Sequence, residues 1–251
     1  DSIAPEQIPY LGLLKSVLGY VDTKDYTYGE LFNEINANTG GINCGVEVFD
    51  RADSTEEFQA MFSVRGKALY TKLDFLFKMI GEILNSSKLE DTKRLYEIIA
   101  SVKSRAQVSL TGAGHSTAVL RAAAYSSPMA AFQDEMAGIG YYQFIEKLEK
   151  DFEQRKEETV EELCKLMKKI LRPENFMISY TGERESMETV QKLAGAVKAG
   201  LGTEPVEKSE EKLTCTKKNE GFKTSGQVQY VAQTGNFKKK GLEYTGALEI
   251  L

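Results

Sequence analysis

Histidine is nearly absent from this sequence, since its 251 residues contain only His115. Hydrolytic zinc sites of proteases need two histidines on one helical face and a glutamate general base, so this chain alone cannot form one. A catalytic serine or cysteine would also normally need a histidine as its base. His115 lies among small residues at an expected helix start, where packing or hydrogen bonding at the helix end is the favoured interpretation over catalysis.

Cysteine is also sparse. Cys44, Cys164 and Cys215 are an odd number with wide spacing and no Cys-x-x-Cys pair, which excludes a disulfide framework or a cysteine metal site. Each is interpreted as a packing residue rather than a nucleophile. Free thiols are typical of a reducing compartment, so we expect an intracellular protein, in the cytoplasm or an organelle matrix.

Long apolar runs, a signal peptide and an excess of positive charge are missing too. No apolar run approaches the roughly 20 residues of a membrane span, and the first residues lack a basic stretch followed by an apolar core. The net charge of -5 gives no attraction to nucleic acid or an anionic membrane. No nucleophile elbow, Walker A or dinucleotide-binding motif occurs. We expect no nucleic acid or membrane partner and no catalytic residue.

What the sequence does contain is alternating helical and strand periodicity. A Ser/Thr-x-x-Glu capping box at Thr27 and Glu30 predicts a helix start, and Gly40-Gly41 predicts its end. Period-2 alternation predicts an antiparallel pair, and helical spacing predicts the remaining elements. We expect strands at 42–48, 58–64, 176–180 and 227–233, and helices at 6–21, 28–39, 67–84, around 95–102, 141–171, 186–201 and from 244 onward.

This order predicts an α+β fold, a small antiparallel sheet covered by several helices. Three strands in the main body are few for a stable sheet, so we expect partner strands upstream of Asp1. Residues 202–219 are polar and charged, which is typical of an exposed linker. The last predicted helix has no cap at Leu251, which indicates a truncated piece of a longer chain.

Several blocks, in this order, resemble the pitrilysin/insulinase family of zinc proteases, in particular its presequence-protease and falcilysin branch. The likeness covers nearly the whole chain, and the order of the blocks is more specific than any one of them. They are Ile8-Pro9-Tyr10-Leu11, Tyr26-Thr27-Tyr28-Gly29-Glu30-Leu31, Asn38-Thr39-Gly40-Gly41-Ile42, Gly66-Lys67-Ala68-Leu69, Gly114-His115, Gly138-Ile139-Gly140-Tyr141, Gln227-Val228-Gln229-Tyr230-Val231-Ala232, Gly235-Asn236-Phe237 and Tyr244-Thr245-Gly246-Ala247-Leu248.

The resemblance implies a protease built of four related α+β domains, in two halves that enclose a peptide chamber. Its inverted His-x-x-Glu-His zinc site lies in the first domain. Aligning 30–41 with the counterpart there places residues 13–17 at the metal motif, with Leu13 and Val17 replacing both histidines and Ser16 replacing the general base. The resemblance therefore implies a related domain that has lost its metal, and no catalytic or metal-binding residue is carried over to this chain.

By the same resemblance, residues 1–202 form the non-catalytic third domain, 203–220 a charged linker and 221–251 the truncated start of the fourth domain. The implied function is to form one wall of the chamber of a zinc-dependent peptidase. Zinc would belong to the parent enzyme only, and the partners would be its catalytic N-terminal half and peptide substrates. Two alternatives stay open: a metal-free core or processing-type subunit of the same superfamily, and an independent helical interaction module.

Overall fold

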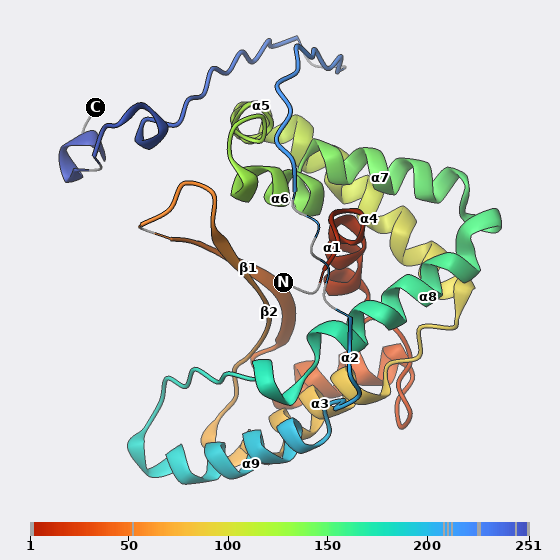
Figure 1. The fold of residues 1–251 in the computed structure, drawn as a ribbon. Helices are drawn as coiled ribbons and strands as arrows, with labels where there is room; N and C mark the ends of the chain where they lie inside the picture. Colours follow the sequence, from red (N-terminus) through yellow and green to blue (C-terminus); the bar gives the residue numbers. More distant parts are fainter. Residues whose placement is uncertain are drawn as a thin grey trace.

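The computed structural model describes residues 3–51, 53–207, 209, 211, 213–224, 227–243 and 245–249. Figure 1 shows a curved two-stranded hairpin with most helices on one side of it. The elements in chain order are η1 Pro5–Gln7, α1 Ile8–Val17, α2 Tyr28–Asn38, β1 Ile42–Asp50, β2 Phe58–Gly66, η2 Tyr70–Lys72, α3 Leu73–Ser86, α4 Thr92–Gly112, α5 Gly114–Ala123, α6 Pro128–Ala137, α7 Ile139–Lys150, α8 Phe152–Ile170, η3 Pro173–Asn175, η4 Arg184–Ser186, α9 Met187–Ala199, η5 Lys238–Lys240 and η6 Gly246–Glu249. The predicted α+β class is confirmed.

Helix α1 forms the centre of the core. It packs against β1, α4, α6, α7 and α8, and Leu13, Leu14 and Val17 are completely buried. The helix ends four residues earlier than predicted because Gly19 adopts a positive φ of 86°, a conformation that glycine takes without strain. An element buried on nearly every side depends on its neighbours for stability.

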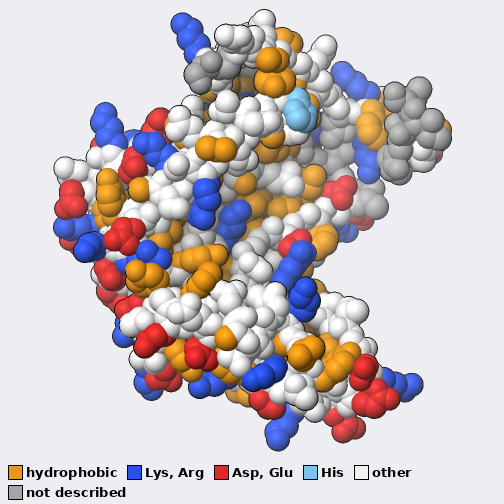
Figure 2. Space-filling model, turned by 180° about the vertical axis from the view of Figure 1, so that it is seen from behind, with side chains coloured by type: hydrophobic (Ala, Val, Ile, Leu, Met, Phe, Trp, Pro, Cys, Tyr) orange, Lys and Arg blue, Asp and Glu red, His pale blue; other side chains and the backbone are white. Residues whose placement is uncertain are grey.

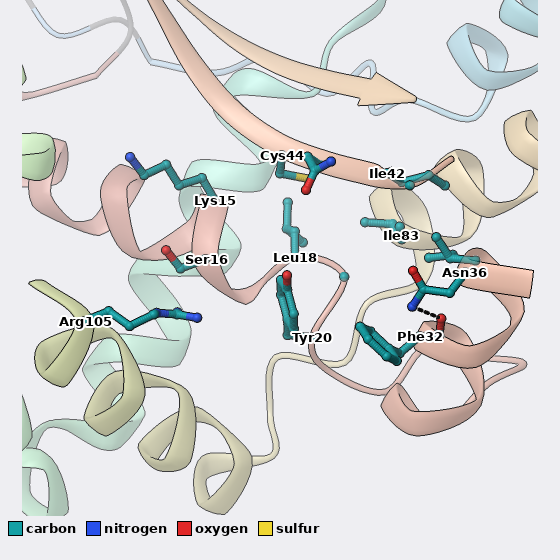
Figure 3. Close-up of a pocket in the computed structure, with 14 residues that line it drawn as sticks. Lys15, Ser16, Leu18, Tyr20, Phe32, Asn36, Ile42, Cys44, Ile83 and Arg105 are labelled. Atoms are coloured by element: carbon teal, nitrogen blue, oxygen red, sulfur yellow. Dashed lines mark hydrogen bonds between the residues drawn. The ribbon is translucent and has the colours of Figure 1, made fainter. Parts of the chain in front are cut away.

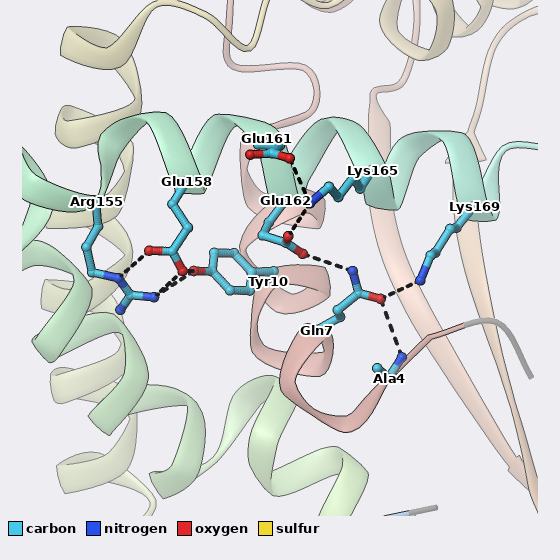
Figure 4. Close-up of polar contacts among 9 residues, drawn as sticks. All are labelled: Ala4, Gln7, Tyr10, Arg155, Glu158, Glu161, Glu162, Lys165 and Lys169. Carbon is cyan, nitrogen blue, oxygen red and sulfur yellow. Dashed lines mark hydrogen bonds and ion pairs between the residues drawn. The ribbon is translucent and has the colours of Figure 1, made fainter. Parts of the chain in front are cut away.

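Polar contacts along one side of α1 add a second connection, to helix α8 (Figure 4). The Gln7 side chain donates to Glu162 at 2.9 Å and accepts from Lys169 at 2.9 Å. Further along, Arg155 donates to the Tyr10 hydroxyl oxygen at 2.9 Å. Because Gln7 and Tyr10 are both buried, these bonds satisfy polar groups that would otherwise be left without water or partner.

The capping box and the antiparallel pair form as predicted. The Thr27 hydroxyl accepts from the Glu30 amide, and the Glu30 carboxylate accepts from the Thr27 amide at 2.9 Å, so α2 begins at residue 28. Strands β1 and β2 pair with Ile42 opposite Gly66 and Asp50 opposite Phe58. One face of this hairpin packs on the core through Cys44, Val46, Val48, Phe58, Phe62 and Val64, among others.

The helix predicted over 141–171 is wrong as a single element. It divides at Asp151, where the backbone leaves the helical region at φ -101°, ψ 16°. Leu148 and Phe152, on either side, are both buried. Both α7 and α8 pack on α1 and α4, but the two helices run in different directions (Figure 1). One straight helix could not follow both directions.

Two predicted strands are also wrong. Residues 176–180 form no strand and pair with none among the described residues, and Met177 is 70% exposed. Residues 227–233 are likewise unpaired, and Val231 is 86% exposed. Alternating apolar residues indicate a strand only where a partner supplies hydrogen bonds to the backbone. Of the helix predicted from 244, residues 246–249 form the 3-10 helix η6, while 244, 250 and 251 lie outside the described residues.

The segment after residue 202 passes α5 (Figure 1), where an ion-pair cluster holds it. Arg121 of α5 donates to Glu220 through Nε at 2.8 Å and Nη2 at 3.0 Å, and also to the buried Asp134 at 2.6 Å. The Tyr125 hydroxyl donates to Glu220 as well. Elsewhere in the segment, Lys239 pairs with Glu56 and the Glu204 carbonyl accepts from Arg172.

No helix in the described part of the chain is long and apolar enough to cross a membrane.

Candidate functional site

The three positions aligned with the metal motif lie on one face of α1 but in different surroundings. Leu13 and Val17 point into the core with no exposed surface, and their hydrocarbon side chains offer no atom that could bind a metal. Ser16 is half-buried and donates to the Gly12 carbonyl at 3.3 Å. These residues do not fit a zinc ion, which requires nitrogen, sulfur or carboxylate ligands. That they descend from metal ligands stays a prediction.

A hollow of about 310 Å³ opens beside Ser16, between the end of α1, helix α2 and strand β1 (Figure 3). Apolar residues, including Leu18, Phe32 and Ile83, line it together with the amides of Asn36 and Asn43. Lys15, Ser16 and Arg105 lie at one end. Figure 2 shows a hollowed face with apolar side chains in its middle and charged ones around it. No acidic side chain is among the described residues that line the hollow.

A second, smaller hollow of about 220 Å³ lies between α1, α4 and α7 and shares Ser16 and Arg105 with the first. Its remaining lining residues are apolar or hydroxyl-bearing, namely Val102, Ala106, Ser109, Leu110, Ala137 and Tyr141. Again the described lining includes no acidic residue. The two hollows therefore meet at one serine and one arginine.

Tyr141 is the unusual member of this set. Its hydroxyl is buried and makes no hydrogen bond with any described residue, whereas buried polar atoms are nearly always paired. Burial raises the pKa of Tyr141, while the nearby Ser16 hydroxyl and Arg105 guanidinium act in the opposite direction. The hydroxyl thus lies close to both groups, although Ser16 directs its own hydrogen bond to Gly12.

The position of the Tyr141 ring depends on a glycine in α1. A Cβ at position 12 would lie 2.8 Å from Cε2 of Tyr141 and 2.5 Å from the carbonyl oxygen of Met136. Both distances are too short for a real side chain, so only glycine lets α6 and α7 approach α1 this closely. Gly12 and Ser16 are one helical turn apart, which aligns the tyrosine ring along this face of α1.

Neither cation at the hollows is neutralised within the described part of the chain. Lys15 and Arg105 form no hydrogen bond or ion pair with any described residue. Burial lowers the pKa of Lys15, because a desolvated ammonium is disfavoured. In contrast, Lys103, two residues before Arg105, pairs with Glu149.

The other residues singled out in the sequence form no site with one another. His115 is exposed on α5, with its ring centroid 6.2 Å from that of Tyr230. All three cysteines are free, and burial raises the pKa of Cys44 to about 12, so its thiol stays protonated at neutral pH. Among the residues that the structure describes, no group of three or more His, Cys, Asp or Glu side chains could hold a metal ion.

Sequence reasoning missed Arg105 and Tyr141. Arg105 occupies an exposed position on a long helix, where a lone arginine is usually a solvated surface residue. Tyr141 lies within the block Gly138-Ile139-Gly140-Tyr141, one of the blocks that carried the resemblance. The block gave no indication that its tyrosine hydroxyl would be buried beside α1.

Known proteins resemble this chain over all or part of its length. The family model described as associated with peptidase family M16, subfamily C, matches residues 1–148. Protein HypA of Clostridium perfringens is 34% identical over the entire chain, and presequence protease 1, chloroplastic/mitochondrial, of Arabidopsis thaliana is 25% identical over the entire chain. The mitochondrial presequence protease of Yarrowia lipolytica is 31% identical over 62% of the chain. The chain spans 26%, 23% and 16% of these three proteins.

Proposed function

The chain belongs to the family associated with peptidase family M16, subfamily C, and from this membership we propose that it is a non-catalytic segment of a longer, zinc-dependent peptidase that degrades peptides. Its relatives include proteins named presequence protease. The match to the family model over residues 1–148 carries the proposal. The zinc and the general base would be supplied by the catalytic N-terminal half of the same polypeptide.

The part we assign to this chain is to form one wall of the chamber that receives peptides. The hollow beside α1 supports this assignment, because apolar and amide side chains line it and it carries cations that no described residue neutralises. A concave surface that combines apolar side chains with hydrogen-bonding groups suits an extended peptide. Confinement by such a wall would let only small or extended substrates reach a zinc ion on the opposite half.

The same proposal covers the domain boundaries and the location. Residues 1–202 would form one non-catalytic domain, 203–220 a linker and 221–251 the start of a further domain. An intracellular location, in cytoplasm or an organelle matrix, is supported by relatives whose names place them in mitochondria or chloroplasts and by the three free thiols.

The test compares this chain with the full-length polypeptide encoded by the same gene. Zinc content and cleavage of a fluorogenic peptide would be measured on both. We expect one zinc per full-length polypeptide together with turnover, and neither from the 251-residue chain. Stoichiometric zinc with turnover in the chain alone would overturn the non-catalytic assignment. A full-length polypeptide without zinc or activity would instead favour the metal-free partner subunit.

A further inference from the structure

The two hollows that meet at Ser16 and Arg105 present hydrogen-bond donors and positive charge, with no acidic residue in their described lining. We propose that Arg105, Ser16 and Tyr141 bind a carboxylate group, the C-terminal carboxylate of a peptide, beside the α1 positions aligned with the metal motif. That the ligand is a peptide rests on the proposed function. That a carboxylate site exists rests on the geometry of α1, α4 and α7.

Donor chemistry is the first argument for an anion. The Arg105 guanidinium has no carboxylate partner in the described chain, although arginine usually pairs with one where it can, often with two parallel hydrogen bonds. The Tyr141 hydroxyl is shut off from water and has no acceptor among the described residues, which leaves a buried donor unsatisfied. A group seated in the smaller hollow would give both of them an acceptor, and the Ser16 hydroxyl could turn from Gly12 to donate as well.

The location on α1 favours a singly charged group over a phosphate. Ser16 lies in the last turn of α1, where the helix dipole contributes partial negative charge. That field disfavours a dianion more strongly than a monoanion, and Lys15 in the same turn offsets it only in part. A carboxylate therefore fits this position better than a phosphate monoester does.

The larger hollow favours a C-terminal carboxylate of a peptide as the ligand. Apolar side chains from three elements, among them Leu18, Phe32 and Ile42, continue directly from the polar end at Ser16 (Figure 3). Its volume of about 310 Å³ is at the lower end of the range for ligand pockets. The last apolar side chain of a peptide could occupy it while the terminal carboxylate contacts Arg105.

The test uses fluorescence anisotropy of a short labelled peptide without charged side chains, ending in leucine, prepared as the free acid and as the C-terminal amide. We expect the chain to bind the acid about tenfold more tightly than the amide, the difference typical of a hydrogen bond to a charged group. Arg105→Gln and Tyr141→Phe should each remove most of this preference. Arg184→Gln, which removes one positive charge from an exposed residue after α8, should keep it.

Thermal unfolding of each variant is the control that tests whether the chain remains folded. If Tyr141→Phe unfolds the chain, Ser16→Ala is a second variant at the same site. Equal binding of acid and amide, or an unchanged preference in Arg105→Gln, would overturn the proposal. Displacement of the labelled peptide by inorganic phosphate and by acetate would also be compared. Equal displacement by the two anions would overturn the proposal, because the site would then bind any anion. If the chain shows no preference for the free acid over the amide while the full-length polypeptide has peptidase activity, this site is refuted and the proposed function stands.

Discussion

Helix α1 and the segment after residue 202 belong to the same chain but are held in place by different means. In α1, Leu13, Leu14 and Val17 are completely buried, and α8 adds hydrogen bonds to Gln7 and Tyr10. The later segment has few buried side chains, and polar contacts at Glu204, Glu220 and Lys239 connect it to the rest of the chain. Apolar burial distributes stability over many contacts, whereas these polar contacts concentrate it at a few groups. Substitutions in the two regions should therefore differ in size and in kind.

The largest effect is expected from Leu13→Ala in α1. Removing a completely buried leucine side chain leaves a cavity in the core, which lowers the free energy of unfolding by about 2–5 kcal/mol. Urea unfolding followed by circular dichroism measures the change. Leu69→Ala is the matched control, because Leu69 is 76% exposed and its loss should change stability by less than about 0.5 kcal/mol. Equal effects of the two substitutions would contradict the central position of α1.

A smaller effect is expected from Gly12→Ala. The added methyl group would meet Met136 and Tyr141, so α6 and α7 must move away from α1, with a loss of about 1–3 kcal/mol. Gly81→Ala in α3 is the control, since a Cβ there meets open space. Because alanine favours a helix over glycine, this control should gain about 0.5–1 kcal/mol. Chemical denaturation of both variants measures the difference in sign.

In the later segment, Glu220→Gln should change global stability little, by less than about 1 kcal/mol, as is typical of single ion pairs near the surface. The local effect should be larger, because Arg121 keeps its ion pair with Asp134 but loses the one that connects it to the segment. Trypsin should then cleave at Lys217, Lys218 and Lys223 several times faster than in the unaltered chain. Glu211→Gln, in the same segment, should leave the cleavage rate unchanged. An equal rate in both variants would show that the cluster does not hold the segment.

The pH dependence of that cleavage gives the smallest and most specific effect. The hydrogen bond from Arg121 lowers the pKa of Glu220 from its ordinary 4.5 to about 2. A lowered pKa in the folded chain means that the contribution is fully present above pH 4.5 and is lost as the pH falls towards 2. An acid-stable protease such as pepsin should therefore release the segment increasingly below pH 4.5 in the unaltered chain, but with no such extra increase in Glu220→Gln.

Much of the fold was predictable from the sequence because local signals coincide with tertiary contacts. The capping box at Thr27 and Glu30 and the alternation in β1 and β2 need only short-range chemistry, and both form as predicted. The helix over 141–171 was wrong because its break at Asp151 depends on where α1 and α4 lie, which periodicity does not encode. The strand predicted over 176–180 was wrong for a related reason, since pairing depends on a neighbour elsewhere in the chain.

The candidate site was less predictable. Alignment with the metal motif pointed to α1, and Ser16 does line both hollows. Arg105 and Tyr141, however, come from two other helices, 89 and 125 residues further along the sequence than Ser16. Only the packing of α4 and α7 on α1 places them together. The unsatisfied Tyr141 hydroxyl is a property of that packing, and no sequence pattern reports it.

The central claim is that positions 13 and 17 of α1 are closed core positions rather than a site that could take up metal. The most direct measurement is thermal unfolding of the double variant Leu13→His with Val17→His, with and without added zinc. Burying two imidazoles in place of apolar side chains should destabilise the chain more than Leu13→Ala does, and zinc should not raise the unfolding temperature. A folded double variant that zinc stabilises, while the unaltered chain does not respond, would contradict the claim.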